Sequence, residues 1–167
     1  MENKTKKIVL AGGCFWGLQD LIRQQPGVVK TIVGYTGDEN MTNPTWFHHG
    51  KHAEAVEIEY DTKKTSYKKL LDFFFQIHNP TTLNQQCNDK GTSYRSAIFY
   101  GSGEEKKEAE NFINIVNKTA RWKNPVVTTL EPLKKFYPAE DYHQDYLQKN
   151  PGGYTCHAIY FDSYLGE

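Results

Sequence analysis

The sequence predicts an α+β domain built from two layers. Short apolar or β-branched runs, typical of strands, are mixed with segments in which apolar residues recur every three or four positions, as in helices. These patterns do not follow the regular βαβα alternation that a doubly wound parallel sheet requires. The chain has 167 residues, enough to bury a core without disulfides or a structural metal, so we expect residues 1–167 to form a single domain.

The expected strands are short runs rich in β-branched and aromatic residues. They cover residues 7–12, 28–35, 53–60, 95–100 and 126–130. The expected helices carry apolar residues on one face. The first expected helix follows Cys14 and ends at Pro26, and the second runs from Thr65 to Asn79-Pro80. The third begins at a capping box formed by Ser102 and Glu105, and the fourth covers residues 139–148. The polar stretch 37–51 is expected to be a loop.

Charge and hydropathy exclude several classes of partner. Lys plus Arg and Asp plus Glu both number 20, so the chain lacks the net positive charge that binds nucleic acid or an anionic membrane. No apolar run is long enough to cross a membrane. The apolar run before Cys14 is also too short for an export signal, so we expect a cytoplasmic protein.

The spacings of cysteine and histidine predict no metal or other cofactor. Three cysteines without a C-x-x-C pair form neither a disulfide framework nor a zinc site, and we expect free thiols in a reducing compartment. The histidines match no metal-ligand spacing.

Cys14 is the strongest candidate for a nucleophile. It lies where a strand ends and a helix begins, and the unpaired N–H groups and positive dipole of a helix start favour a thiolate. Gly12 and Gly13 allow close backbone approach, while Phe15 and Trp16 offer an apolar wall for a small uncharged group. The alternative is that Cys14 and the two aromatic residues are ordinary core packing.

Residues 13–17, Gly-Cys-Phe-Trp-Gly, resemble the signature of the A-type methionine sulfoxide reductases. Further blocks resemble the same family in the same order: Gly34-Tyr35, His52 to Val56, His78 to Thr81, Asn88 to Ser96, Ala139 to Gln144 and Asn150 to Tyr154. The resemblance covers roughly residues 8–157, and such a run of blocks is far more specific than one motif. We accordingly expect a two-layer α/β sandwich with a mixed sheet, a ferredoxin-like core and a long C-terminal coil.

The resemblance implies that Cys14 attacks the sulfur of methionine sulfoxide, free or in peptides, and acts on the S epimer. A sulfoxide sulfur is a poor electrophile until its oxygen is protonated or strongly hydrogen-bonded. The matched positions assign Glu54 as the proton donor and Tyr35 and Tyr94 as donors to the sulfoxide oxygen. Without the motif, Glu54 would be grouped with the solvated carboxylates of the same strand.

The same blocks assign the rest of the pocket. The resemblance implies that Phe15 and Trp16 hold the methionine methyl group and that Asp89 orients the site through hydrogen bonds. A turn-forming Asp is the alternative for Asp89. Tyr142 and Tyr154 are weaker candidates for pocket residues.

Attack on the sulfoxide leaves Cys14 as a sulfenic acid, which a second thiol converts to a disulfide. We expect Cys156 in that role, because the break at residues 151–153 should leave its segment mobile. The chain departs from the family here, since Thr155 stands where many relatives have cysteine, no cysteine follows Cys156, and Cys87 replaces a common glycine. Cys87 is therefore the alternative resolving thiol. Thioredoxin is the expected reductant of the disulfide.

Two other interpretations compete with the reductase. In a non-catalytic redox sensor or peptide-binding module, Cys14 and Cys156 would form a regulatory disulfide and the aromatic residues would hold a partner. A general thiol oxidoreductase is the second, and the missing C-x-x-C pair argues against it. Neither explains why Glu54 and two tyrosines fall on matched positions, and turnover of methionine sulfoxide distinguishes them from the reductase.

Overall fold

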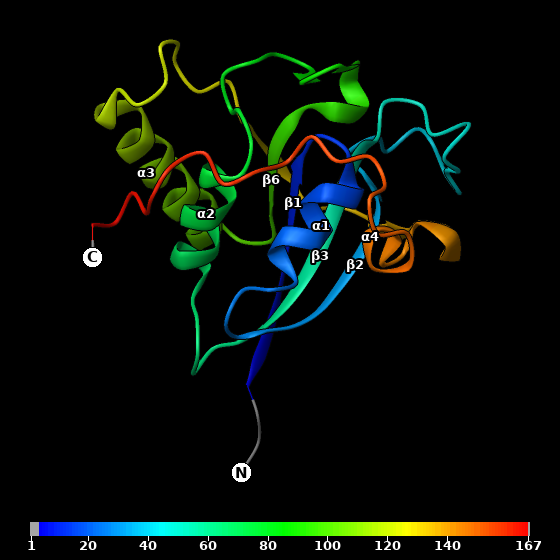
Figure 1. The fold of residues 1–167 in the computed structure, drawn as a ribbon, viewed down its shortest axis with the longest axis horizontal. Helices are drawn as coiled ribbons and strands as arrows, with labels where there is room; N and C mark the ends of the chain where they lie inside the picture. The colour runs from blue at the N-terminus through cyan, green and yellow to red at the C-terminus, as the bar shows by residue number, and fades with distance from the viewer. Residues whose placement is uncertain (1–3, 167) are drawn as a thin grey trace.

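The computed structural model describes residues 4–166, which form a six-stranded mixed sheet with helices packed on it (Figure 1). The strands of this sheet are β1 (Thr5–Gly12), β2 (Val28–Thr36), β3 (Ala53–Asp61), β6 (Ser96–Tyr100), β7 (Thr129–Pro132) and β8 (Tyr137–Pro138). The helices are α1 (Phe15–Ile22), α2 (Tyr67–Gln76), α3 (Gly103–Thr119) and α4 (Tyr146–Lys149). The smaller elements are the paired β4 (Gln85–Gln86) and β5 (Asp89–Lys90), and the 3₁₀ turns η1 (Thr92–Tyr94) and η2 (Asp141–His143). Within the described residues, no helix combines the length and apolar character needed to cross a membrane.

The strands are ordered β7-β6-β1-β3-β2-β8 across the sheet. The pairs β6–β1, β1–β3 and β3–β2 are antiparallel, whereas β7 joins β6 in parallel. The segment β1-α1-β2-β3-α2-β6 therefore has the β-α-β-β-α-β connectivity of a ferredoxin-like core. The α+β class, the mixed sheet and the ferredoxin-like core expected from the sequence are confirmed.

The two faces of the sheet carry cores of different size, because alternate residues of each strand point to opposite sides. On the helix side, Leu10 and Val56 pack with Leu18 of α1 and Phe74 of α2, and α1 lies in front of the central strands in Figure 1. The other side holds a smaller cluster, partly covered by the segment after β7: Val9, Ala11, Ala53, Ala55, Ala97 and Phe99, with Leu133 and Phe136 packed on them. Side chains on the helix side are therefore the more deeply enclosed.

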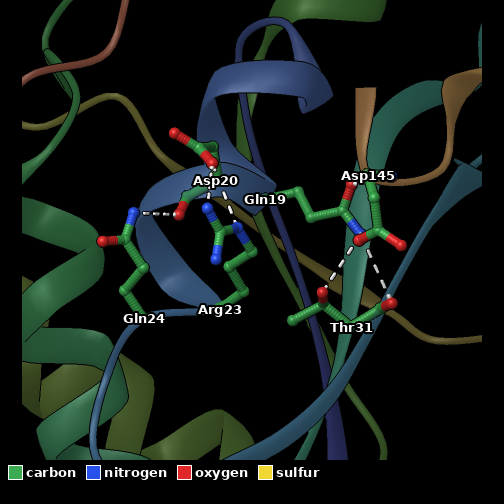
Figure 2. Close-up of polar contacts among 6 residues, drawn as sticks. All are labelled: Gln19, Asp20, Arg23, Gln24, Thr31 and Asp145. Atoms are coloured by element: carbon green, nitrogen blue, oxygen red, sulfur yellow. Dashed lines mark hydrogen bonds and ion pairs between the residues drawn. The ribbon is translucent and has the colours of Figure 1, made fainter. Parts of the chain in front are cut away.

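The prediction of one helix over residues 139–148 is wrong. The structure has the short elements η2 and α4 there, separated by Asp145 with a left-handed φ of 54°. Figure 2 shows that Gln19 of α1 extends toward both Asp145 and Thr31 of β2. Gln19 Nε2 donates to Thr31 Oγ1 at 3.0 Å, and the Asp145 N–H donates to Gln19 Oε1 at 3.0 Å. The neighbouring Gln144 side chain bonds both the N–H and the C=O of Val33. These bonds hold the segment against β2 in a non-helical path.

Strand β7, which was expected over residues 126–130, begins later than expected, at Thr129. The N–H of Val126 donates to Asn117 Oδ1 at 2.9 Å, and the N–H of Val127 donates to Pro80 O at 2.8 Å. These two residues therefore bond to the ends of neighbouring segments and not to β6.

The chain after α4 forms the expected long coil, which runs past α1 and along α2 in orange to red in Figure 1. The N–H of Tyr160 donates to Gln76 O at 2.8 Å. The side chain of Asp72 accepts both the N–H of Tyr164 and the hydroxyl of Ser163, each at 2.6 Å. The distal part of the coil is therefore anchored to α2.

We predict that Asp72→Ala lowers the free energy of unfolding by about 1–3 kcal/mol, because the buried N–H of Tyr164 loses its acceptor. Denaturant titration measures this change. The matched control is Asp162→Ala in the same coil, whose exposed side chain we expect to contribute less than about 0.5 kcal/mol. Equal losses in the two variants would mean that Asp72 does not anchor the coil.

Candidate active site

Cys14 lies at the turn from β1 to α1, as expected from the sequence. Gly13 makes the turn with a φ of 91°, and a Cβ on Gly13 would lie 2.7 Å from the side chain of Gln86. Cys14 itself occupies the position before the first residue of α1 and is only 8% exposed. The turn therefore places this thiol inside the protein, at the positive end of a short helix.

The pKa of the Cys14 thiol is raised above its ordinary value, mainly by burial and then by the charge of Glu54. The backbone N–H groups of Trp16 and Gly17 act in the opposite direction, as expected at a helix start. They do not outweigh the loss of solvation. The start of α1 thus favours the thiolate as expected, but burial has the larger effect on the pKa of Cys14.

Glu54 lies on the helix side of β3, directly across the strand pair from Tyr35 of β2. It is 1% exposed, and its Oε1 accepts the N–H of Phe15 at 3.2 Å. Burial raises the pKa of Glu54 to about 8, although the N–H of Phe15 and the side chain of Trp46 favour the charged form. The carboxyl group is therefore mostly protonated at pH 7 and adjoins the residue that follows Cys14.

Tyr94 and Asp89 face the same region from the β5–η1 segment. Burial raises the pKa of Tyr94, and the charges of Glu54, Asp89 and Cys14 raise it further, which requires all four groups to lie near one another. Among residues 4–166 the Tyr94 hydroxyl has no hydrogen-bond partner, whereas Asp89 Oδ2 accepts the hydroxyl proton of Tyr154 at 2.9 Å. Tyr94 therefore offers an uncommitted donor beside the thiol.

Tyr35 is fully buried, and its hydroxyl already donates a hydrogen bond within the protein. It donates to Glu140 Oε1 at 3.0 Å, while Glu140 Oε2 accepts the N–H of Trp46 at 3.0 Å. Glu140 thereby ties the 37–51 loop to β2 and to the segment before η2. The sequence assigned Tyr35 to the site but did not assign Glu140 a role.

The aromatic residues after Cys14 have different environments. Phe15 is fully buried and packs on Tyr35, with ring centroids 5.7 Å apart. Trp16 is half-buried, stacks on Tyr146 at 3.8 Å, and donates its indole N–H to His143 Nδ1 at 2.9 Å. The rings of Trp46 and Trp16 also stack, with centroids 6.3 Å apart. The wall expected from Phe15 and Trp16 is thus extended by residues from two distant segments.

Four of these neighbours carry no role in the sequence-based prediction: Trp46, Glu140, His143 and Tyr146. Glu140 and His143 fall inside a block that resembles the family, which is the signal that could have identified them. Trp46 had a weaker signal, a tryptophan beside Phe47 in an otherwise polar loop.

Two cysteines are paired, contrary to the expectation of three free thiols. Cys87 and Cys156 form a disulfide with a Cα–Cα separation of 6.2 Å, and Cys14 is free. The expected mobile arm is also tethered on both sides of Cys156, by the Tyr154–Asp89 bond and by His157 Nε2, which bonds Gly12 O at 2.6 Å. Sequence spacing gave no sign of the pair, since 69 positions separate its members.

Two features of the described residues lie apart from the chemistry predicted at Cys14. Among residues 4–166, no three His, Cys, Asp or Glu side chains lie close enough together to hold a metal ion. A cavity of about 560 Å³ is lined by charged side chains that include Asp38, Lys51 and Glu131, and it contains none of the predicted catalytic residues. The predicted catalytic residues therefore lie outside this cavity.

Comparison with known proteins agrees with this site. The family model described as peptide methionine sulfoxide reductase matches residues 6–163. Peptide methionine sulfoxide reductase MsrA 2 of Rhodopirellula baltica is 58% identical over 153 residues, covering 92% of this chain and 90% of that protein. The reduced form of Mxr1 from Saccharomyces cerevisiae superposes with a TM-score of 0.86 at 39% identity, covering 93% of this chain and 92% of Mxr1. A complex of Mxr1 with Trx2 superposes with a TM-score of 0.65 at 29% identity, covering 95% and 94% of the two chains. This chain therefore belongs to the peptide methionine sulfoxide reductase family.

Proposed function

We propose that this chain reduces the S epimer of methionine sulfoxide, in peptides and as the free amino acid, with Cys14 as nucleophile and thioredoxin as reductant. The observation that carries the proposal is a buried free thiol near a buried carboxyl group whose pKa is about 8. A sulfur nucleophile and a protonated acid are the two groups that sulfoxide reduction needs. Membership of the family supports the same activity.

In the proposed reaction the Cys14 sulfur attacks the sulfoxide sulfur, and the oxygen moves to Cys14 as a sulfenic acid while methionine leaves. The thiol and the sulfoxide together contain every atom of the two products, so the step needs no outside proton. The thiol proton must nevertheless reach the oxygen. Glu54 can carry it, by giving its own proton to the sulfoxide oxygen and accepting the proton of Cys14.

The protonation of Glu54 also affects the nucleophile. The charge of Glu54 is one cause of the raised pKa of Cys14, and that contribution disappears when the carboxyl group is neutral. The N–H groups of Trp16 and Gly17 then favour the developing thiolate without opposition from Glu54. A neutral acid is therefore the form that suits both the oxygen and the attacking sulfur.

We assign the oxygen-binding role to Tyr94 and Tyr35. The free hydroxyl of Tyr94 supports its part directly, whereas Tyr35 would have to turn its hydroxyl from Glu140 toward the substrate. Asp89 positions this side of the site through its bond to Tyr154. Donors aimed at the oxygen strengthen as negative charge develops there, which lowers the barrier.

We assign the methionine methyl group to the wall formed by Phe15 and Trp16. Trp46 and Tyr146 both stack with Trp16 and restrain its ring, which supports a preformed apolar surface. If the methyl group lies on this wall and the oxygen faces Glu54, only one face of the sulfur remains open to Cys14. That constraint accounts for selection of one epimer.

Cys156 is the proposed resolving thiol. Its neighbour His157 bonds Gly12, two residues before Cys14, so the tail already lies beside the nucleophile. The resulting disulfide must then be reduced by a dithiol, and the complex of the related Mxr1 with Trx2 supports thioredoxin in that role.

A non-catalytic redox module remains the alternative, and the Cys87–Cys156 disulfide is the observation that favours it, since a sensor could cycle on that pair alone. The enclosed acid beside a third, free cysteine has no use in such a sensor. Release of methionine from its sulfoxide separates the two functions.

We also propose that residues 1–167 form one reductase domain and that it works in the cytoplasm. A single six-stranded sheet joins both core clusters, which supports one domain. The apolar run Ile8–Ala11 is buried inside the central strand β1, which supports its use as core and not as a targeting segment.

We predict that Cys14→Ser abolishes methionine sulfoxide reduction with dithiothreitol and with thioredoxin, because a hydroxyl cannot replace the thiol as nucleophile. Chromatographic measurement of released methionine tests this. Turnover above a few per cent of the parent rate would remove Cys14 from the nucleophile role.

We predict that Glu54→Gln lowers the rate by roughly 10²-fold to 10⁴-fold, the range for loss of a general acid, while binding is retained. In the parent, the rate should fall as pH rises through about 8, because Glu54 is then deprotonated. Glu54→Gln should lose that fall. Glu57→Gln on the opposite face of β3 is the matched control. A parent-like rate and pH profile in Glu54→Gln would mean that protonation comes from another group.

We predict that Cys156→Ser, given thioredoxin, releases about one methionine per enzyme and then stalls as the Cys14 sulfenic acid. Cys87→Ser is the matched control, since it keeps Cys156 and should convert the sulfenic acid to a Cys14–Cys156 disulfide. Labelling with dimedone detects the sulfenic acid. Accumulation of label in Cys87→Ser but not in Cys156→Ser would make Cys87 the resolving residue.

A further inference from the structure

We infer that Cys87 is a third redox cysteine, which takes the disulfide over from Cys14 and presents it to the external dithiol as a Cys87–Cys156 bridge. The inference rests on the proposed function and extends it to the regeneration of Cys14. Its starting point is the disulfide state of the structure, in which Cys87 and Cys156 are joined and Cys14 is free.

The neighbours of all three cysteines meet at one point, Gly13. A Cβ on Gly13 would lie 2.7 Å from the Gln86 side chain and 3.4 Å from His157 Nε2. Gly13, Gln86 and His157 are each adjacent in sequence to one of the three cysteines. The segments that carry the three cysteines therefore meet at one corner of the fold, which makes exchange between the three thiols sterically plausible.

Solvent exposure increases along the proposed relay. Cys14 is 8% exposed, Cys156 is half-buried, and Cys87 is exposed. A protein dithiol must bring its own sulfur in line with the disulfide that it reduces. Cys87 is the exposed residue of the bridge, whereas a disulfide on Cys14 would involve a buried residue.

The backbone conformation at Cys87 disfavours a side chain, which indicates that the thiol of Cys87 has a role of its own. Cys87 lies in the two-residue turn between β4 and β5 with a φ of 53°, a left-handed conformation that disfavours any residue with a Cβ. Cys87 is an exposed residue, so core packing does not account for it. The disulfide to Cys156 is the interaction that this side chain makes with the rest of the fold.

The exchange step is balanced and needs no new oxidant. The Cys14 sulfenic acid and the Cys156 thiol first form a disulfide and water. The Cys87 thiol then attacks the Cys156 sulfur, the Cys14–Cys156 bond breaks, and the proton of Cys87 ends on Cys14. The products are the Cys87–Cys156 disulfide and a free Cys14 thiol, as the structure has them. The external dithiol finally attacks Cys87 and reduces the bridge.

The test counts methionine released by fully reduced enzyme with excess methionine sulfoxide and no reductant. A relay frees Cys14 to act again, so the parent should release about two methionines per enzyme and form the Cys87–Cys156 disulfide. Cys87→Ser should release about one and stop as Cys14–Cys156. Peptide mapping by mass spectrometry identifies each disulfide.

Cys87→Gly serves as the second variant, because glycine readily adopts the left-handed conformation of this turn. If this variant also releases only one methionine per enzyme, the loss of the second cannot be attributed to misfolding. A parent yield of about one, or a yield of about two from either Cys87 variant, would overturn the relay while leaving the proposed function intact. A parent that releases no methionine would instead overturn the proposed function, and the relay with it.

Discussion

The site depends on the burial of two ionisable groups that lie near each other, the Cys14 thiol and the Glu54 carboxyl. Burial penalises the charged form of each, so both hold their protons near neutral pH. An exposed carboxylate at the same position would be ionised and could not serve as an acid. At the start of α1, the N–H of Phe15 donates to Glu54, and the N–H groups of Trp16 and Gly17 favour the Cys14 thiolate. These donors do not outweigh the effect of burial, so each group can change its protonation state during the reaction.

The ferredoxin-like core accounts for the precision of this pair. The β2–β3 register sets Tyr35 opposite Glu54, and the β1–α1 turn brings Cys14 and Phe15 to the same end of the sheet. The enclosure, by contrast, comes from segments far along the chain. Glu140 links Tyr35 to the loop that carries Trp46, and these contacts span 105 and 94 positions of sequence. The strands thus fix the reactive groups, and the loops exclude water from them.

Local patterns in the sequence predicted the core elements because apolar periodicity determines which face of a strand or helix is buried. Strand alternation could also have separated Glu54 from Glu57, since Glu54 shares the parity of the buried Val56. The helix expected over residues 139–148 failed for the opposite reason: the Gln19 and Gln144 side chains override the local pattern there. The position of Trp46 in the site could not be derived from its weak local signal, because it follows from contacts between distant segments and not from spacing.

The same burial that suits the chemistry creates a conflict at the end of each cycle, because a nucleophile closed off from water is also closed off from a protein reductant. The C-terminal coil can relieve this conflict, because its residue Cys156 is bonded to Cys87 in an exposed turn and its neighbour His157 contacts the residues just before Cys14. Tethers on both sides of Cys156 limit how far it can move, and one of them, Tyr154 to Asp89, joins the coil to the site itself. Transfer of the disulfide between the cysteines is therefore expected to depend on the geometry around Cys14, since Asp89, to which we assign the orienting role, also holds the tail through Tyr154.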